Sequence, residues 1–287
     1  MSAPDDHSDT PQAGTATAST ALRIAIPLGV LIVALGAWEM SVRLTSVPSY
    51  ILPAPSVIGR TMVADWPLLW GSLQVTLETT LLGLALAVLG GVGLAVLFSL
   101  SRIVEYSLYP FAIVLQVTPV IAVAPLLLIY LPQNVAVLAC AWIVAFFPVL
   151  SNTMLGLRSV DRSLLELFAL YGPAPAPGIW GRFRLRARTL WILRAPAALP
   201  AFMAGLRIAT GLSLIGAVVA EMAAGSAGAG SGLAYRIIES QYRLNIPRLF
   251  AALVLLAGVG VILFLAMAGL SHLALRHWHE SERRPEP

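Results

Sequence analysis

Apolar residues run for about 20 positions or more at a time along most of this chain. Runs of that length can cross the ~30 Å hydrocarbon layer of a membrane as helices. They are too long and too continuous to be the strands of a membrane barrel. We therefore expect an all-α membrane protein with six spans, over Leu22–Ser41, Leu73–Leu100, Tyr106–Leu131, Val135–Leu155, Ala197–Glu221 and Leu249–Leu275.

Prolines and polar segments divide these runs. The third span contains Pro110, Pro119 and Pro125, so it must be kinked, and the carbonyls it frees need partners inside the bundle. The second span carries small residues at Gly83, Gly90, Gly91 and Gly93, where a neighbouring helix could approach closely. Residues 156–195 are predicted to form the one long polar loop.

The composition excludes most soluble classes of protein. Only 11% of the 287 residues are charged and 58% are hydrophobic, whereas a globular domain carries about 25% charged residues. The single cysteine, Cys140, excludes a disulfide-stapled secreted fold. All 18 basic residues are arginine, so the chain has neither the lysine of a Walker A loop nor a lysine for a Schiff base.

The arginines are distributed unevenly between the two sides of the predicted membrane protein. With both termini cytoplasmic, twelve arginines fall in inside segments and five in outside segments, with Arg207 within a span. This bias satisfies the positive-inside rule. It also accounts for the net charge of +4 without a nucleic-acid partner.

Three charged residues in or near the spans are candidates for function, because burying a charge in a membrane costs about 2.5–3.5 kcal/mol on insertion scales. Arg207 is predicted to lie about 14 Å into the apolar layer, either facing a translocation path or bonded to freed carbonyls or a carboxylate. Glu221 ends the fifth span, where it is either functional or a hydrated helix end. Glu78 lies a short way into the second span, and a link from Glu78 to Arg207 is conceivable.

No set of residues points to catalysis or to a metal. An intramembrane enzyme would need paired aspartates or a serine and a histidine at matching depths, and the spans offer neither. His277 and His279 have no cysteine or carboxylate at ligand spacing, so a solvated helix end is favoured over a metal site. The glycine-rich segment 225–232 does not have the spacing of a phosphate-binding loop.

The polar loop contains the sequence VDRSLLELFALYG at residues 160–172. Its apolar residues, with Glu166 between them, predict a short amphipathic helix ended by Gly172 and Pro173. Exposed at the cytoplasmic face, such a helix could be bound by a partner protein, or it could lie on the bilayer surface.

These residues resemble the EAA signature of binding-protein-dependent ABC importer permeases. Glu166 is followed by Ala169 and Gly172, and later by Ala195-Pro196-Ala-Ala-Leu199-Pro200. Three further segments, QVTPVIAVAPLLL (116–128), AFFPVLSNTMLGLRSVD (145–161) and residues 196–222, are similar to the branch that handles nitrate, sulfonates, taurine and pyrimidine precursors. The similarity covers roughly residues 22–279.

The resemblance implies the transmembrane architecture of a type I ABC importer in a bacterial inner membrane. It implies a tail at 1–20, a first helix and periplasmic segment at 21–70, a permease domain at 71–275 with a coupling helix at about 163–172, and a tail at 276–287. The residues it assigns to ATPase coupling are Glu166, Ala169, Tyr171, Gly172, Pro196, Leu199 and Pro200.

The implied partners are ABC ATPase subunits, a periplasmic or lipid-anchored solute-binding protein, and a second permease copy in a homodimer. ATP and Mg²⁺ would bind the ATPase, which leaves this chain without a cofactor or catalytic residue. The mechanism implied is alternating access, in which closure of the ATPases moves the coupling helices. A structural or channel-type scaffold without ATPase coupling is the alternative, and the transported solute stays open.

The chain departs from the family pattern at two places. Leu167-Phe168 replaces the usual alanine pair, and about eleven extra residues, at about 173–189, separate the glycine from the later Leu-Pro pair. The extra residues could adjust the ATPase contact, bind anionic lipid or form an inert loop.

Overall fold

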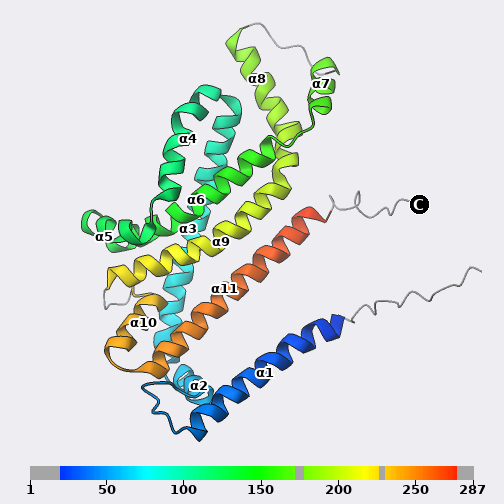
Figure 1. The fold of residues 1–287 in the computed structure, drawn as a ribbon. Coiled ribbons are helices and arrows are strands. Elements are labelled where there is room, and N and C mark those ends of the chain that lie inside the picture. The colour runs from blue at the N-terminus through cyan, green and yellow to red at the C-terminus, as the bar shows by residue number, and fades with distance from the viewer. Residues whose placement is uncertain (1–19, 172–177, 226–229, 277–287) are drawn as a thin grey trace, which may run out of the picture.

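The computed structural model describes residues 20–171, 178–225 and 230–276, and every regular element in these ranges is a helix. Figure 1 shows long helices packed together, with shorter helices at their ends. The helices are α1 Thr20–Leu44, α2 Pro55–Ala64, α3 Trp66–Leu100, α4 Arg102–Val117, α5 Val120–Tyr130, α6 Gln133–Leu157, α7 Arg162–Tyr171, α8 Ile179–Thr189, a π-helical turn Leu190–Arg194, α9 Ala195–Ala224, α10 Leu233–Tyr242 and α11 Ile246–Leu275.

Five helical stretches among the described residues are long and apolar enough to cross a membrane. They include α1, α3, α6, α11 and the continuous run from Phe183 to Ala224. The third predicted span is the bent pair α4 and α5, whose axes differ by 100°. The bend falls at Thr118 and Pro119, where Pro119 is the N-cap of α5, so the expected proline kink is a break between two helices.

The bent pair connects opposite ends of the bundle. We call these the α7 end, where α6 finishes at Leu157, and the α10 end, where α6 starts at Gln133. Arg158 at the α7 end pairs with Glu105 near the start of α4, and α5 runs out at Tyr130 just before Gln133. Because α4 and α5 together reach from one end of α6 to the other, they count as one broken span, which gives the six predicted.

The core is formed by α3, α6 and α9, which pack along most of their length. Small residues allow the close approach. A Cβ at Gly83 would lie 2.7 Å from the Cβ of Ala141, and one at Gly91 would lie 2.9 Å from Val149. Gly93, which the sequence also suggested as a packing position, faces open space. Close packing of small residues is how membrane helices associate without a hydrophobic driving force.

The prediction of one polar loop over residues 156–195 is wrong for its second half. Residues 179–194 form α8 and a π-helical turn that continue into α9. The segment is polar, with arginines at positions 182, 184, 186 and 188, but arginine, leucine and alanine are good helix formers. The π-helical turn lies directly before Ala195-Pro196, where proline lacks the N–H that a regular helix needs.

Helix α1 lies apart from the core (Figure 1) and is attached mainly at its end near α2. There the ring of Trp38 packs in a tilted arrangement against Phe250 of α11, with the ring centroids 5.8 Å apart. The Glu39 carboxylate accepts hydrogen bonds from Ser56 N at 3.0 Å and Ser56 Oγ at 2.7 Å, at the start of α2. Most of the rest of α1 is exposed.

Candidate functional site

Helix α7 projects from the end of the bundle where α6 finishes (Figure 1), and none of its side chains is buried. Asp161 Oδ1 accepts a hydrogen bond from Ser163 N at 3.1 Å at its start. Leu165 and Phe168 are half-buried, whereas Glu166 and Ala169 are exposed. Gly172, predicted to end this helix, lies outside the described residues.

The outward face of α7 is apolar as well as charged. Large apolar side chains are exposed over the whole helix, and Tyr171 is 86% exposed. The exposed apolar residues are Leu164, Leu167, Leu170 and Tyr171. Contiguous exposed apolar surface on so short a helix is typical of a site that another protein or a membrane covers.

The other predicted coupling residues lie at the start of α9. Pro196 occupies the first turn, where a proline is tolerated; Pro196 and Pro200 are exposed and Leu199 is half-buried. This segment packs on the end of α6, since a Cβ at Gly156 would lie 2.7 Å from Ala198 Cα. The structure therefore places it beside the part of α6 that leads into α7, and not on α7 itself.

Two of the three membrane charges are exposed and lie apart. The Arg207 guanidinium lies 5.7 Å from the ring centroid of Phe264, and Glu78 is exposed on α3. No hydrogen bond or ion pair joins Glu78 to Arg207 in the part of the chain that the structure describes. The carbonyl or carboxylate partner expected for a structural arginine is not found there either.

Glu221 is not a hydrated helix end, because α10 folds back over it and leaves it 5% exposed. Its Oε2 atom accepts hydrogen bonds from Thr76 Oγ1 at 3.0 Å and from Ala234 N at 3.1 Å. Its Oε1 atom is buried and has no partner among the described residues. Glu221 also lines a cavity of about 450 Å³, together with Gln133 and Tyr235. Glu221 thus joins α9 to α3 and α10.

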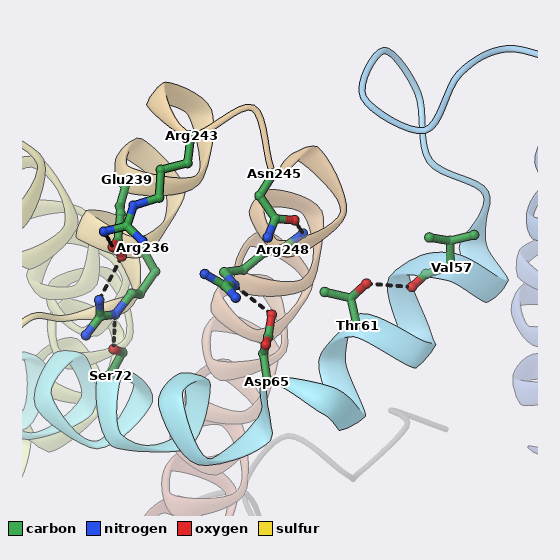
Figure 2. A network of polar contacts seen from close by, with 9 residues as sticks. All are labelled: Val57, Thr61, Asp65, Ser72, Arg236, Glu239, Arg243, Asn245 and Arg248. Carbon is green, nitrogen blue, oxygen red and sulfur yellow. Dashed lines mark hydrogen bonds and ion pairs between the residues drawn. The ribbon is translucent and has the colours of Figure 1, made fainter.

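Figure 2 shows a second polar network at the α10 end, which sequence reasoning missed. Arg248 Nε on α11 donates to Asp65 Oδ2 at 2.6 Å. Arg236 Nε on α10 donates to Ser72 Oγ at 2.9 Å, and its Nη1 pairs with Glu239 at 2.7 Å. The spacing of Arg236, Glu239 and Arg243 matches a helical row of opposite charges, a signal that could have revealed part of this network.

The family of the chain follows from comparison with known sequences. The family described as "Binding-protein-dependent transport system inner membrane component" matches residues 83–276, about two thirds of the chain. This chain belongs to that family. The permease is 34% identical over 252 residues to a "Probable ABC transporter permease protein" of Haemophilus influenzae, covering 88% of this chain and 97% of that one.

A second relative and a solved structure agree. The permease is 32% identical to the "Formylaminopyrimidine transport permease protein ThiX" of Halalkalibacterium halodurans, over 83% of this chain and 90% of that one. A chain in the crystal structure titled "an amino acid ABC transporter with histidines" superposes with a TM-score of 0.58 at 20% identity, covering 76% of the permease and 97% of that chain. That likeness concerns the fold, which is that of a type I importer.

Family membership confirms several sequence predictions. The chain is a multi-pass inner-membrane permease subunit of an ABC importer. It is not an enzyme, because a separate subunit hydrolyses ATP, and its class works with an ATPase and a solute-binding protein. No cluster of metal-ligating side chains occurs among the described residues, while His277 and His279 lie outside them.

Proposed function

We propose that α7 is the surface on which the ATPase subunit docks and through which its movements reach the membrane helices. The observation that carries this proposal is the set of exposed apolar side chains on α7 around the exposed Glu166. Leu167 and Phe168 would give a bulkier contact than an alanine pair. ATP and Mg²⁺ would bind the ATPase and not this chain.

The α7 end would face the cytoplasm. Six passes that begin with α1 would bring both described ends of the chain, Thr20 and Arg276, to the same side of the membrane as α7. The arginine bias of the sequence supports placing this side in the cytoplasm. The α10 end, with Glu221 and the network of Figure 2, would then face the solute-binding protein.

A second copy of the permease would complete the translocation path. Arg207 supports this arrangement, because its charge is exposed within an apolar helix and contacts only the Phe264 ring in the described chain. Charged side chains in membrane helices face a bundle interior or a water-filled cavity. A homodimer would enclose Arg207 in such an interior or cavity, with its side chain facing either the translocation path or the second copy.

The transported solute would be a small pyrimidine precursor. The 32% identity to a permease named for formylaminopyrimidine supports this class, and sulfonates and nitrate are the competing classes. Uptake into proteoliposomes, with the cognate binding protein and ATPase, would test it. Unlabelled formylaminopyrimidine should inhibit the uptake of a labelled pyrimidine precursor. Inhibition of that uptake by taurine alone would contradict the proposal.

The proposal that the ATPase docks on α7 is tested by measuring how strongly the permease stimulates ATP hydrolysis. The permease would be co-expressed with candidate ATPase partners, placed in nanodiscs and assayed for stimulated ATP hydrolysis. Glu166→Ala should lower stimulation by about 10-fold or more, because a charge-assisted contact contributes about 1.5–3 kcal/mol. Ser163→Ala, on the same exposed helix, should leave it unchanged. If an ATPase copurifies and Glu166→Ala is as active as the wild type, α7 does not transmit the movement.

A further inference from the structure

A cavity of about 670 Å³ opens at the α7 end, between α7 and the ends of the membrane helices. Residues from α3, α4, α6, α7, α8 and the π-helical turn line it, so it lies where six helical elements converge. Its charge is one-sided. Five arginines and a single carboxylate face it, namely Arg102, Arg158, Arg162, Arg186, Arg194 and Glu105.

Three of these arginines have partners in the protein. Arg158 pairs with Glu105. Arg186 Nη1 donates to Leu100 O at 3.1 Å, and Arg194 Nη1 donates to Ser99 Oγ at 3.1 Å. The last two contacts are at the C-terminal end of α3, where unpaired carbonyls and the helix dipole favour a cation. These three arginines therefore have structural explanations.

The other two arginines, Arg102 and Arg162, have no such structural explanation. Neither has a hydrogen bond or ion pair within the described residues. Arg102 is the first residue of α4 and Arg162 the first residue of α7. Helix N-termini carry partial positive charge and disfavour a cation by about 0.3–1 kcal/mol. Both side chains are exposed, and two cations at helix N-termini around one cavity give it a positive potential that favours an anion.

We propose that this cavity binds a phosphate-bearing anion held by Arg102 and Arg162. The guanidinium group matches the geometry of phosphate oxygens, and the volume accommodates a phosphate with a glycerol unit. Exposed Leu97 and Trp191 on α3 and the π-helical turn border this end, as expected at a membrane interface. The phosphate belongs either to an anionic lipid headgroup or to a free solute. If it belongs to a lipid, the cytoplasmic orientation proposed above places that lipid in the cytoplasmic leaflet, and the binding itself does not depend on the orientation.

An anion at this place has a mechanical consequence. Arg102 is on the broken span and Arg162 is on the proposed docking helix, so an anion bridging them would tie α7 to α4. Loss of the anion would loosen α7 without removing any residue that the ATPase contacts.

The test uses the full permease in nanodiscs. The double variant Arg102→Gln/Arg162→Gln is compared with Arg188→Gln, an exposed arginine of α8 that does not line the cavity. In mixed phosphatidylglycerol and phosphatidylcholine nanodiscs, native mass spectrometry measures phosphatidylglycerol retained by the protein. In phosphatidylcholine alone, the Tm is measured in sodium phosphate and in sodium chloride of equal ionic strength.

Either of two results supports the proposal. Phosphatidylglycerol affinity that falls about 10-fold or more only in the double variant identifies a lipid headgroup. A phosphate-specific rise in Tm, lost only in the double variant, identifies a free anion. The proposal is wrong if neither effect separates the double variant from Arg188→Gln. Since neither readout needs an ATPase, these results are independent of the Glu166 experiment.

Discussion

Thr76 on α3 donates a hydrogen bond of 3.0 Å to the buried carboxylate of Glu221 on α9, 145 residues further along the chain. The same hydroxyl oxygen accepts a bond from Leu233 N at 2.8 Å, and Glu221 accepts one from Ala234 N. The first N–H groups of a helix have no partner within it. Thr76 and Glu221 therefore cap α10 from two other helices, since its own N-cap, Gly232, has no side chain.

This arrangement predicts that Gly232 tolerates no side chain. A Cβ there would overlap the Glu221 carboxyl group, so Gly232→Ala must push α10 away from α9. We expect a loss of about 1–3 kcal/mol in the free energy of unfolding, as for an overpacked core, measured as a lower Tm in nanodiscs. Gly230→Ala is the control, because a Cβ at Gly230 meets nothing within 4 Å. Equal Tm values for the two variants would contradict the contact.

The sequence predicts the membrane spans far better than it predicts these polar contacts. Six apolar runs are visible because each must cross the hydrocarbon layer on its own. The capping of α10 depends on Thr76 and Glu221, which no local pattern relates. The sequence left Glu221 as either a functional charge or a hydrated helix end, because the fifth apolar run finishes there, and only the return of α10 buries it.

The arginine-rich segment shows a different limit. Residues 179–194 looked like a loop because four arginines alternate with other residues, a pattern with neither an apolar face nor a helix cap. The helix forms because it continues α9, so its start is nucleated by the neighbouring turns and not by its own sequence. Arg186 reaches α3 only through that helical geometry.

Among the ion pairs in Figure 2, the one between Arg248 and Asp65 should contribute more to stability than the one between Arg243 and Glu239. Its side chains are only 20% and 22% exposed, so Arg248→Gln leaves a half-buried carboxylate without its charge partner. We expect a destabilisation of about 1–3 kcal/mol. Arg243→Gln removes an arginine that is 66% exposed, and it should cost less than about 1 kcal/mol. Thermal unfolding of both variants measures the difference, and a larger effect at Arg243 would refute this ranking.

Two glycines of α9 should respond in opposite directions to alanine. At Gly216 a Cβ would lie 2.7 Å from Cys140 O and 2.9 Å from Ala141 Cα, so the backbones of α6 and α9 must separate. Gly216→Ala should cost about 1–3 kcal/mol. Gly211 has open space around it, and Gly211→Ala should be neutral or stabilise by up to about 1 kcal/mol through helix propensity. A Tm for Gly216→Ala that is no lower than that of Gly211→Ala would show that α6 and α9 are not packed this closely.

Arg207 should affect transport without affecting folding. Its one described contact is the Phe264 ring at 5.7 Å, and an exposed cation–π contact contributes only about 0.5–1 kcal/mol. Arg207→Gln should therefore leave the Tm within a few degrees of the wild type. If Arg207 faces the path or the second copy, the same variant should lower solute uptake, while Arg60→Gln, an exposed arginine on α2, should not. A large loss of Tm with unchanged uptake per folded transporter would mean that Arg207 is a structural residue and does not support the proposed dimer.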